Sequence, residues 1–350
     1  SAFPRAAWLR AERAVLERIS ARDLRYGDPR GVHSLRVAVA GWLTRNRGIR
    51  ADPDDLLIVN GVAQTLALMA HVLLARGKPA VGVEEPGSFG SRNLFAFQGL
   101  RTVPIPVDEQ GIDVDALIES NVDSVLVTPA HQMPTGVVLA APRRRALLDW
   151  AADGGVVIED DYDAEHRYDR APVCAMQALA PNRIVYTGSV SKILAPALRL
   201  GWLLAPPELR ADLVDAKHYI DISSPALSQF VLAELMTNGT VEKHLRLTRT
   251  RHRRRRNAML DALAEYFPGA RVHGVAAGLH LLVSLPGLLD DADLAERALA
   301  EGVAVHPLSL YRANPGEPGL VMGYAATPPD QLREAIRRLS AVFHRQSPNG

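Results

Sequence analysis

The sequence predicts an α/β protein whose mostly parallel sheet is covered by helices on both faces. Short apolar runs rich in Val, Ile and Leu alternate with longer helical patterns through the middle of the chain, and turn residues separate them. Continuous apolar strands joined through helices are typical of βαβ units. Of the 350 residues, 47% are hydrophobic and 23% are charged, which excludes a disordered or fibrous protein.

The predicted elements follow this alternation along the chain. Two N-terminal helices, Pro4–Ile19 and Ser34–Asn46, are expected to pack beside a smaller C-terminal layer or to carry a dimer contact. The strands of the large layer are expected at Leu56–Asn60, Val81–Glu84, Ser124–Thr128, Val156–Asp160, Arg183–Thr187 and Leu200–Leu204. Its helices are expected at Val62–Arg76, Phe89–Gln98 and Pro142–Asp153.

The pattern changes in the last third of the chain and predicts a smaller α/β domain. A long helix is expected from about Thr240 to Tyr266. The expected strands and helices after it are Gly278–Leu285, Ala292–Ala300, Val303–Pro307, Leu320–Tyr324 and Asp330–Arg345. We therefore predict three parts: an N-terminal segment (1–49), a large domain (50–225) and a small C-terminal domain (226–350).

Charge and cysteine content narrow the class of protein. The formal net charge is +1, so the chain as a whole is not a polycation built to bind nucleic acid. No apolar run reaches the roughly 18 residues that span a bilayer. Cys174 is the only cysteine, which excludes an internal disulfide and fits a reducing cytoplasm. The chain starts at Ser1 rather than Met, and we expect it to be a fragment.

Four lysines are present: Lys78, Lys192, Lys217 and Lys243. One of them, Lys192, lies in the segment Gly188-Ser189-Val190-Ser191-Lys192 directly after a predicted strand, and Arg199 follows seven residues later. Another predicted strand ends in Glu159-Asp160-Asp161-Tyr162-Asp163, and an earlier one passes through Gly61 into a helix. In an open α/β sheet, ligands bind at the carboxyl ends of the strands.

These residues match what pyridoxal 5′-phosphate (PLP) requires. Lys192 supplies an amine for a Schiff base, and Asp160 supplies a carboxylate for the pyridine nitrogen. Tyr162 supplies a phenol near the ring hydroxyl. A phosphate fits the helix start after Gly61, where Val62, Ala63 and Gln64 offer N–H groups. Hydroxyls and a guanidinium come from Ser189, Ser191 and Arg199.

Each motif alone has a simpler interpretation. Asp160, Asp161 and Asp163 could form a divalent-metal cluster or a solvated turn. Ser189-Val190-Ser191-Lys192 could be a loop with an exposed lysine, and Gly61 an ordinary βα turn. Their joint order favours PLP, and we expect no metal.

The chain resembles the fold-type-I PLP proteins of the class I/II aminotransferase type. Within them it resembles the aminotransferase-like domain of the MocR family, the GabR-like bacterial transcription regulators. The resemblance covers nearly the whole chain and rests on Phe3-Pro4, Trp8, 26–31 (Tyr-Gly-Asp-Pro-Arg-Gly), 35–36, 128–136 (Thr-Pro-Ala-His-Gln-Met-Pro-Thr-Gly), 159–165 (Glu-Asp-Asp-Tyr-Asp-Ala-Glu) and 188–201.

The resemblance implies a role for each matching residue. It makes Lys192 the Schiff-base lysine, and Asp160, with Asp161 as the fallback, the partner of the pyridine nitrogen. Tyr162 would contact the ring hydroxyl with His131 nearby. The phosphate would be held by Ser189, Ser191, Arg199 and the amides of Val62, Ala63 and Gln64. Tyr26 resembles a tyrosine that reaches the phosphate of the neighbouring subunit, which implies a homodimer.

Two positions depart from the family pattern. The aromatic residue that often stacks on the ring is displaced by one position, so Phe89 or Ser88 is expected to line its face. Amino-acid aminotransferases carry a carboxylate-binding arginine where this chain has Val321. This substitution puts turnover of ordinary α-amino acids in doubt. The candidate substitutes are Arg30, Arg170 and Arg312.

The segment Arg246–Arg256 holds seven arginines and suggests nucleic acid at first sight. Apolar residues at helical spacing, Val241, Leu245, Met259, Leu260 and Leu263, favour instead an amphipathic helix with arginines on its other faces.

The combined prediction is the effector-sensing domain of a MocR-type regulator. It would bind PLP and an amine or amino-acid effector, or sense PLP itself, and contact DNA only through an N-terminal domain absent from this chain, with no membrane partner. The alternative is a free-standing PLP-dependent aminotransferase or related lyase. A third reading is a sheet-based binding protein without PLP.

Overall fold

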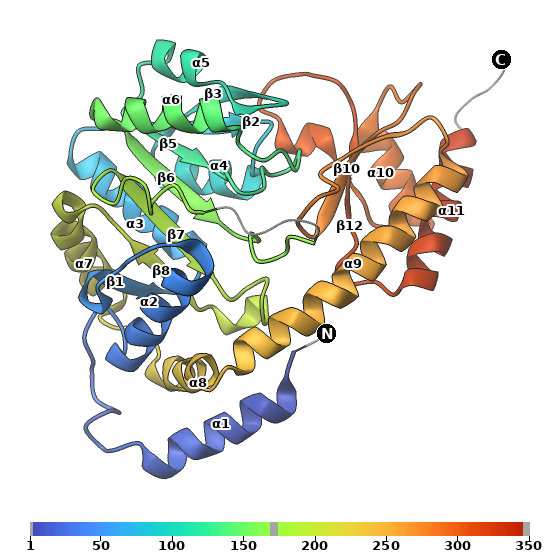
Figure 1. Cartoon of the computed structure of the whole chain (residues 1–350). Coiled ribbons are helices and arrows are strands. Elements are labelled where there is room, and N and C mark those ends of the chain that lie inside the picture. The colour runs from blue at the N-terminus through green and yellow to red at the C-terminus, as the bar shows by residue number, and fades with distance from the viewer. Residues whose placement is uncertain (1–2, 169–173, 346–350) are drawn as a thin grey trace.

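The computed structural model describes residues 3–168 and 174–345. Its large layer is an eight-stranded sheet in the order β1-β8-β7-β6-β5-β2-β3-β4 (Figure 1). The strands are β1 (Leu56–Val59), β2 (Ala80–Glu85), β3 (Arg101–Asp108), β4 (Gly111–Ile112), β5 (Ser124–Val127), β6 (Val156–Asp161), β7 (Ile184–Ser189) and β8 (Gly201–Leu204). The central pairs are parallel, and β8 runs antiparallel to both β1 and β7. The predicted mostly parallel sheet is therefore confirmed.

Helices cover both faces of this sheet because its strands are apolar on both sides. One apolar core joins α3 (Val62–Ala75) and α7 (Pro207–Asp221) to the sheet, and Phe95 of α4 (Phe89–Phe97) belongs to the same core. On the other face, α5 (Val114–Glu119) and α6 (Ala141–Ala152) close a second core.

Strand β3 was not predicted, and its sequence explains why. It contains Pro104 and Pro106, residues that are normally confined to edge strands because they cannot donate a ladder hydrogen bond. Here β3 pairs fully with β2 on one side and only with the two-residue β4 on the other. The prolines thus mark a strand near the sheet edge rather than a loop.

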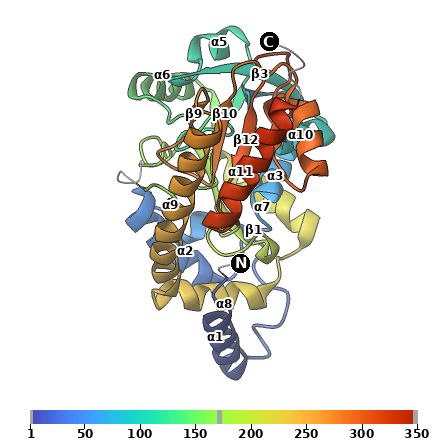
Figure 2. The same cartoon turned by 90° about the vertical axis from the view of Figure 1, so that its right-hand side faces the viewer.

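The structure contradicts the expectation that the N-terminal helices pack beside the small C-terminal layer. α1 (Arg5–Arg18) and α2 (His33–Arg47) contact α8 (Ala226–Thr237), and they share a core with β1 and β8 of the large sheet. Figures 1 and 2 both place α1 at the base of the molecule, below α8. They therefore belong with the large layer and not with the small one.

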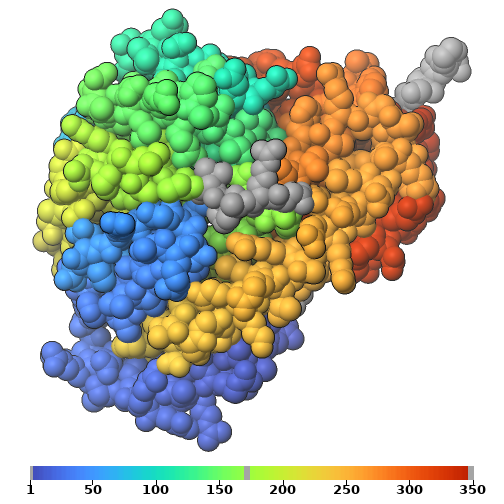
Figure 3. Space-filling model, viewed as in Figure 1, coloured from blue at the N-terminus to red at the C-terminus, as the bar shows by residue number. Residues whose placement is uncertain are grey.

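A smaller layer follows the long helix α9 (Thr240–Tyr266). Its four-stranded antiparallel sheet has the order β11-β12-β10-β9. The elements are β9 (Arg271–His273), β10 (His280–Ser284), α10 (Asp291–Ala300), β11 (His306–Pro307), β12 (Leu320–Gly323) and α11 (Pro329–His344). In the space-filling view these orange-to-red residues form one body beside the large layer (Figure 3).

Three short 3-10 turns connect successive elements within a layer: Pro53–Asp55 and Pro196–Leu198 in the large layer, and Leu308–Tyr311 in the small one. In the described ranges 3–168 and 174–345, no helix combines the length and apolar character needed to cross a bilayer.

The arginine-rich part of α9 behaves as an amphipathic helix. Val241, Leu245 and Met259 are buried in apolar cores. Arg249 donates a hydrogen bond to the carbonyl of Glu165, and Arg256 donates one to that of Val275. Part of the arginine set therefore contributes to packing of α9 against the rest of the chain.

Candidate functional site

The candidate site lies at the carboxyl ends of parallel strands, as the sequence predicts. Asp160 is the penultimate residue of β6 and pairs with Thr187 of β7 in register. Lys192 lies in the turn that follows β7 and is exposed. Its charge lowers the pKa of Asp160 and of His280. Strand order thus brings the predicted lysine and the predicted carboxylate together.

Asp160 has the properties of a group that awaits a cation. Its Oδ1 is buried and has no hydrogen-bond partner among the described residues. Burial, together with the charges of Asp161, Asp163 and Glu84, raises the pKa of its carboxyl to about 7, and the charge of Lys192 opposes this. A protonated ring nitrogen beside Oδ1 would supply both the missing hydrogen bond and a compensating charge.

Asp161, the fallback for this role, is engaged elsewhere. Successive side chains of a strand point to opposite faces of the sheet. The Oδ2 of Asp161 lies 2.5 Å from Nε of Arg47 and accepts a 2.6 Å hydrogen bond from the hydroxyl of Tyr186. The structure therefore favours Asp160 over Asp161 as the free carboxylate.

The divalent-metal interpretation of the three aspartates does not fit this arrangement. Asp161 pairs with Arg47, and Asp163 pairs with His131 across 3.0 Å. Among the described residues, the His/Cys/Asp/Glu group whose ligand atoms lie within 4.8 Å of one another is His131, Asp163 and His280. The aspartates of the Glu-Asp-Asp-Tyr-Asp motif are thus divided among different partners.

Tyr162 lies against His131. The phenol oxygen is 3.0 Å from Nδ1 of His131, and the same Nδ1 is 3.0 Å from Oδ2 of Asp163. Burial and the charges of Asp163, Asp160 and Glu84 raise the pKa of Tyr162 well above its ordinary value. The side chain is therefore a phenol and not a phenolate, able to donate a hydrogen bond.

An anion cup is formed where β1 enters α3. Gly61 caps the helix at φ 77° without any side-chain hydrogen bond to the helix N-terminus. A Cβ at Gly61 would lie 2.7 Å from the guanidinium of Arg199, and Arg199 donates a 2.8 Å hydrogen bond to the carbonyl of Asn60. The glycine thus permits the arginine to approach the helix start closely. Both features favour an anion.

The other predicted phosphate ligands differ in whether their polar groups already have hydrogen-bond partners. Ser189 is buried at the end of β7, and its Oγ accepts a 3.4 Å hydrogen bond from the amide of Ser191. The amide of Gln64 already donates to the carbonyl of Gly61, and its side chain bridges Asn60 and Asp221. Val62 and Ala63, the first two helical residues, have no acceptor within the helix.

Phe89 and Val321 belong to one apolar cluster. Val321 is 4% exposed and packs with Leu282, Leu308 and Tyr311, while Phe89 and Met133 pack against this group. The Phe89 ring meets that of Tyr311 edge-on at 5.3 Å. Ser88 instead caps α4 by accepting from the amide of Ser91. The position expected for a carboxylate-binding arginine is therefore embedded in apolar side chains.

The proposed substitutes for that arginine differ in their surroundings. Arg30 is paired with Asp28 at 2.7 Å. Arg312 lies over Gly316, where a Cβ would approach its Nη1 to 2.5 Å. Arg170 lies outside the described residues. Of the two that are described, Arg30 is already neutralised by a carboxylate.

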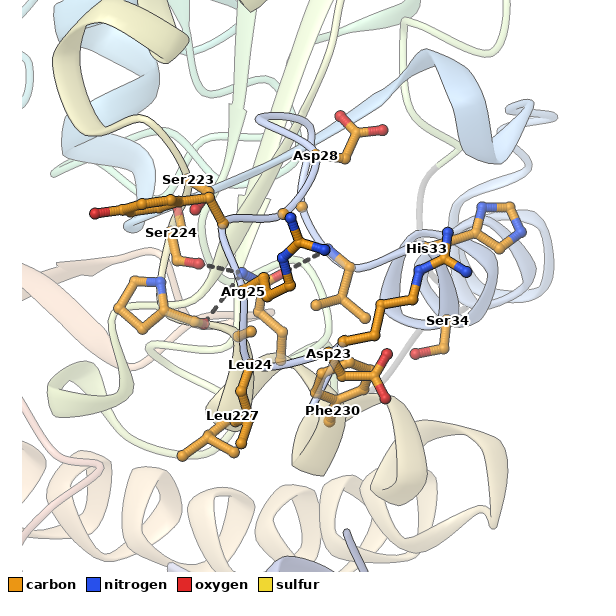
Figure 4. A pocket seen from close by; sticks show the side chains of 18 of the residues that line it. Asp23, Leu24, Arg25, Asp28, His33, Ser34, Ser223, Ser224, Leu227 and Phe230 are labelled. Carbon is orange, nitrogen blue, oxygen red and sulfur yellow. Dashed lines mark hydrogen bonds between the residues drawn. The ribbon is translucent and has the colours of Figure 1, made fainter. Parts of the chain in front are cut away.

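Tyr26 lies apart from the rest of the predicted site. It is 86% exposed and lines an open groove of about 1140 Å³. Figure 4 shows the residues that line this groove, with Ser223 and Ser224 on one side, His33 and Ser34 on the other, Leu24 and Arg25 between them, and Leu227 and Phe230 below. The residues that line this groove include neither Lys192 nor Asp160.

Sequence reasoning missed three supporting residues. Arg47 comes from α2 and fixes Asp161, Asp163 fixes His131, and His280 of the small layer approaches His131 with ring centroids 5.1 Å apart. His280 opens β10, and no local motif marks it. Gly278 is a sequence signal for this contact, because a Cβ at that position would collide with the His131 ring.

Comparison with known proteins agrees with this geometry. The family model "Aminotransferase class I and II" matches residues 3–339. The HTH-type transcriptional regulator YdeL of Bacillus subtilis is 32% identical over 98% of this chain and 74% of its own length. The 2-aminoadipate transaminase of Thermus thermophilus is 33% identical over 97% of this chain and 87% of its own length.

The structural comparison leads to the same group. The crystal structure of Pyrococcus horikoshii kynurenine aminotransferase superposes with a TM-score of 0.90 at 29% identity and covers 99% of this chain and 89% of that one. The regulator MocR of Rhizobium meliloti is also among the relatives. The chain therefore belongs to the class I and II aminotransferase family, with relatives among both the MocR-type regulators and the aminotransferases.

Proposed function

We propose that this chain is the PLP-binding, effector-sensing domain of a MocR/GabR-type transcriptional regulator. Membership of the class I and II aminotransferase family implies PLP as the cofactor. The observation that carries the proposal is the buried, unpartnered Oδ1 of Asp160, on a carboxyl whose pKa burial raises to about 7 and the charge of Lys192 lowers.

The residues present fit this cofactor. Lys192 would bind its aldehyde carbon, Asp160 would hold the ring nitrogen, and Tyr162, with His131 beside it, would contact the ring hydroxyl. The phosphate would lie at the start of α3 beside Val62 and Ala63, with Gln64, Ser189, Ser191 and Arg199 around it. Phe89 would line the ring face. When bound, PLP supplies an electron-withdrawing ring that activates an attached amine.

The same residues explain what this chain contributes to ligand binding. Asp160, once paired with a cation, remains a carboxylate, because the opposite charge offsets the burial that raises its pKa. Tyr162 donates a hydrogen bond, and the guanidinium of Arg199 holds an anion at the helix N-terminus, where the helix dipole adds to the attraction. Lys192 is the group that can accept or return a proton at the ligand amine.

A sensing role is supported by the apolar setting of Val321. An amino-acid enzyme needs a strong orienting contact for the substrate carboxylate, and bidentate arginine supplies it best. Val321 instead packs among Leu282, Leu308 and Tyr311. An amine, an amino acid held in another way, or PLP itself then acts as effector by shifting the conformation of a dimer.

The proposal includes a homodimer whose interface covers the groove lined by Tyr26. The phenol of Tyr26 would reach the phosphate cup of the second subunit. DNA would be contacted through a helix-turn-helix segment of the kind named in the relatives and not through this chain. The exposed position of Tyr26 supports the shared site.

A free-standing aminotransferase is the second candidate, favoured by the 33% identity to a transaminase over nearly the whole chain. The test is incubation of the PLP-loaded protein with amino acids and oxo acids. A change in the visible spectrum without sustained product formation supports the sensor, and steady turnover supports the enzyme.

The cofactor itself is tested directly. The purified protein is expected to be yellow after addition of PLP, and borohydride is expected to fix the label on Lys192, as read by peptide mass spectrometry. Lys192→Ala should lose both properties, whereas Lys217→Ala should remain labelled at Lys192. Labelling elsewhere, or a chromophore retained by Lys192→Ala, would overturn the proposal.

A further inference from the structure

A buried carboxylate–imidazole pair supports the phenol of Tyr162 from behind. His131 and Asp163 have side chains that are each 1% exposed, and their Nδ1 and Oδ2 atoms lie 3.0 Å apart. The phenol oxygen of Tyr162 is 3.0 Å from the same Nδ1. Three polar atoms from two loops therefore meet, and two of them belong to buried side chains.

The position of the proton in this cluster follows from the chemistry of its members. An ionised carboxylate accepts hydrogen bonds and donates none. Burial would raise the pKa of Asp163, but the charge and hydrogen bond of His131 lower it below the ordinary value. Asp163 is therefore ionised, and Nδ1 of His131 must carry the proton that lies between them.

This assignment restricts the hydroxyl of Tyr162. Because Nδ1 of His131 already bears a hydrogen, the phenol oxygen can accept from that nitrogen but cannot donate to it. The phenol hydrogen is left to point toward Asp163, toward Sδ of Met133, which lies 3.9 Å from the phenol oxygen, or into the site. A ligand oxygen placed in the site would then meet a donor.

We propose that Asp163 is a positioning residue for Tyr162: by holding the hydrogen on Nδ1 of His131, it leaves the Tyr162 hydroxyl free to donate to the ring oxygen of a bound pyridoxal. This inference rests on the proposed function and adds to it a residue that acts through His131. Asp163 itself would not contact the ligand.

The small layer completes the surroundings of this pair. Nε2 of His280 lies 3.1 Å from the carbonyl of Pro134 and donates to it, and burial lowers the pKa of His280 to about 4. A neutral His280 ring beside His131 leaves Asp163 as the charged partner of the pair. Gly278 precedes β10 and admits the His131 ring where a Cβ would collide with it.

Other charged groups face the cluster and must be separated from Asp163 in any test. The charges of Asp160 and Glu84 raise the pKa of Tyr162. The charge of His166 lowers the pKa of Asp163, and the charge of Lys192 lowers the pKa of His280. Glu84 is the most useful of these. It accepts hydrogen bonds from Thr128 and Gln132 rather than from His131, so above about pH 7, where its carboxyl is ionised, its removal changes the charge near Tyr162 without freeing His131.

The first test reads the proton on the native protein. Nitrogen-15 NMR of the full chain labelled at histidine, assigned with a His131→Asn variant, is expected to show a hydrogen on Nδ1 of His131. In Asp163→Asn the hydrogen is expected to move to Nε2, as happens when the aspartate of a Ser-His-Asp triad becomes asparagine. A hydrogen only on Nε2 of His131 in the native protein would overturn the proposal.

The second test couples Asp163 to Tyr162 in the PLP-loaded protein. The readout is the pH midpoint of the visible chromophore, measured in the native chain, Asp163→Asn, Tyr162→Phe and the double variant. Loss of the carboxylate charge lowers the midpoint in every background, because it disfavours the protonated form. Loss of the phenol donor raises the midpoint, because a donated hydroxyl favours the deprotonated form.

The two effects separate in the cycle. In the Tyr162→Phe background only the lost charge acts, so the shift caused by Asp163→Asn is expected to lie at least half a pH unit lower than in the native background. Glu84→Gln is the matched control, and its shift should be the same in both backgrounds. Equal shifts for Asp163→Asn would mean that it acts by charge alone and would overturn the inference.

The outcomes also distinguish this inference from the proposed function. Borohydride labelling of Lys192 is measured in every variant. If the native chain is not labelled, the proposed function fails. If the native chain is labelled and the shifts caused by Asp163→Asn are equal, only the role of Asp163 fails. Should Asp163→Asn not fold, Asp163→Ala, which removes the acceptor that holds the hydrogen on Nδ1 of His131, replaces it in the cycle, and the NMR measurement on the native protein still decides.

Discussion

Arg47 and Asp161 form an ion pair of 2.5 Å in which both side chains are 1% exposed. Arg47 is the last residue of α2, and Asp161 ends β6 next to Asp160, so the pair ties the N-terminal helices to the strand that carries the candidate site. Tyr186 of β7 donates to the same carboxylate. The pair holds Asp161 on the face of the sheet opposite to the site.

Replacing Arg47 should therefore lower the free energy of unfolding of the chain. In Arg47→Met the carboxylate of Asp161 stays buried without its cation, and breaking a buried pair costs about 3–5 kcal/mol. Chemical denaturation measures this loss. The control is Arg45→Met on the same helix, because the Arg45–Glu242 pair is exposed at its arginine and an exposed pair contributes at most about 1 kcal/mol. Similar losses in the two variants would show that the buried Arg47–Asp161 pair stabilises the fold no more than an exposed pair does.

A second prediction concerns stability and pH in the protein without cofactor. Burial raises the pKa of Glu84 to about 7 from an ordinary value of 4.5, and hydrogen bonds from Thr128 and Gln132 only partly offset it. A raised carboxyl pKa means that the folded chain binds the proton more tightly than the unfolded chain. Its contribution is full below about pH 4.5 and is lost as the pH rises through about 7.

Glu84→Gln should remove this part of the pH dependence. The shift corresponds to an upper bound on the order of 3 kcal/mol between pH 4.5 and neutrality. The free energy of unfolding of Glu84→Gln is expected to fall less steeply over that range than that of the native chain. Glu119→Gln, at an exposed position, should keep the native slope. Parallel curves for Glu84→Gln and the native chain would contradict the raised pKa.

A third prediction follows from Val321. Matched ligand pairs, such as phenethylamine and phenylalanine, differ by one carboxylate. With Val321 packed among Leu282 and Tyr311, that carboxylate has no arginine on β12 to bind it. We expect the amine to shift the visible spectrum at the same or a lower concentration than the amino acid. An amino acid that binds tenfold more tightly, about 1.4 kcal/mol, would mean that another cation holds its carboxylate.

Much of the large layer could be predicted from sequence, because its buried strands are continuous apolar runs with short turns. The Gly61 turn and Lys192 follow strands, Asp160 lies at the carboxyl end of one, and binding at these strand ends is a general property of open α/β sheets. β3 was missed because Pro104 and Pro106 argue against a strand unless its edge position is known.

The supporting residues could not be found in the same way. Arg47 and His280 reach the site across more than 100 residues of chain from Asp161 and His131, respectively. No periodicity or spacing connects such pairs, since only the packing of α2 and of the small layer brings them together. The choice between Asp160 and Asp161 likewise needed the partner of each carboxylate.

The last prediction tests whether the site is shared between two chains. Tyr26 is 86% exposed on the rim of the groove between Leu24 and Ser224, so Tyr26→Ala should change the free energy of unfolding of the chain by no more than about 0.5 kcal/mol. If its phenol holds the partner's phosphate, the same variant should release PLP at least tenfold more readily, as measured by dialysis and visible absorbance. The control is Tyr219→Ala, because Tyr219 is also highly exposed, at 85%; this variant should retain PLP as the native chain does.

Mixed dimers give a sharper test of the shared site. A chain that carries both Tyr26→Ala and Lys192→Ala, paired with a native chain, keeps one lysine, and that lysine faces the altered tyrosine of the other subunit. Its PLP should then be lost as readily as from Tyr26→Ala dimers, and native-like retention would place Tyr26 outside the partner's site.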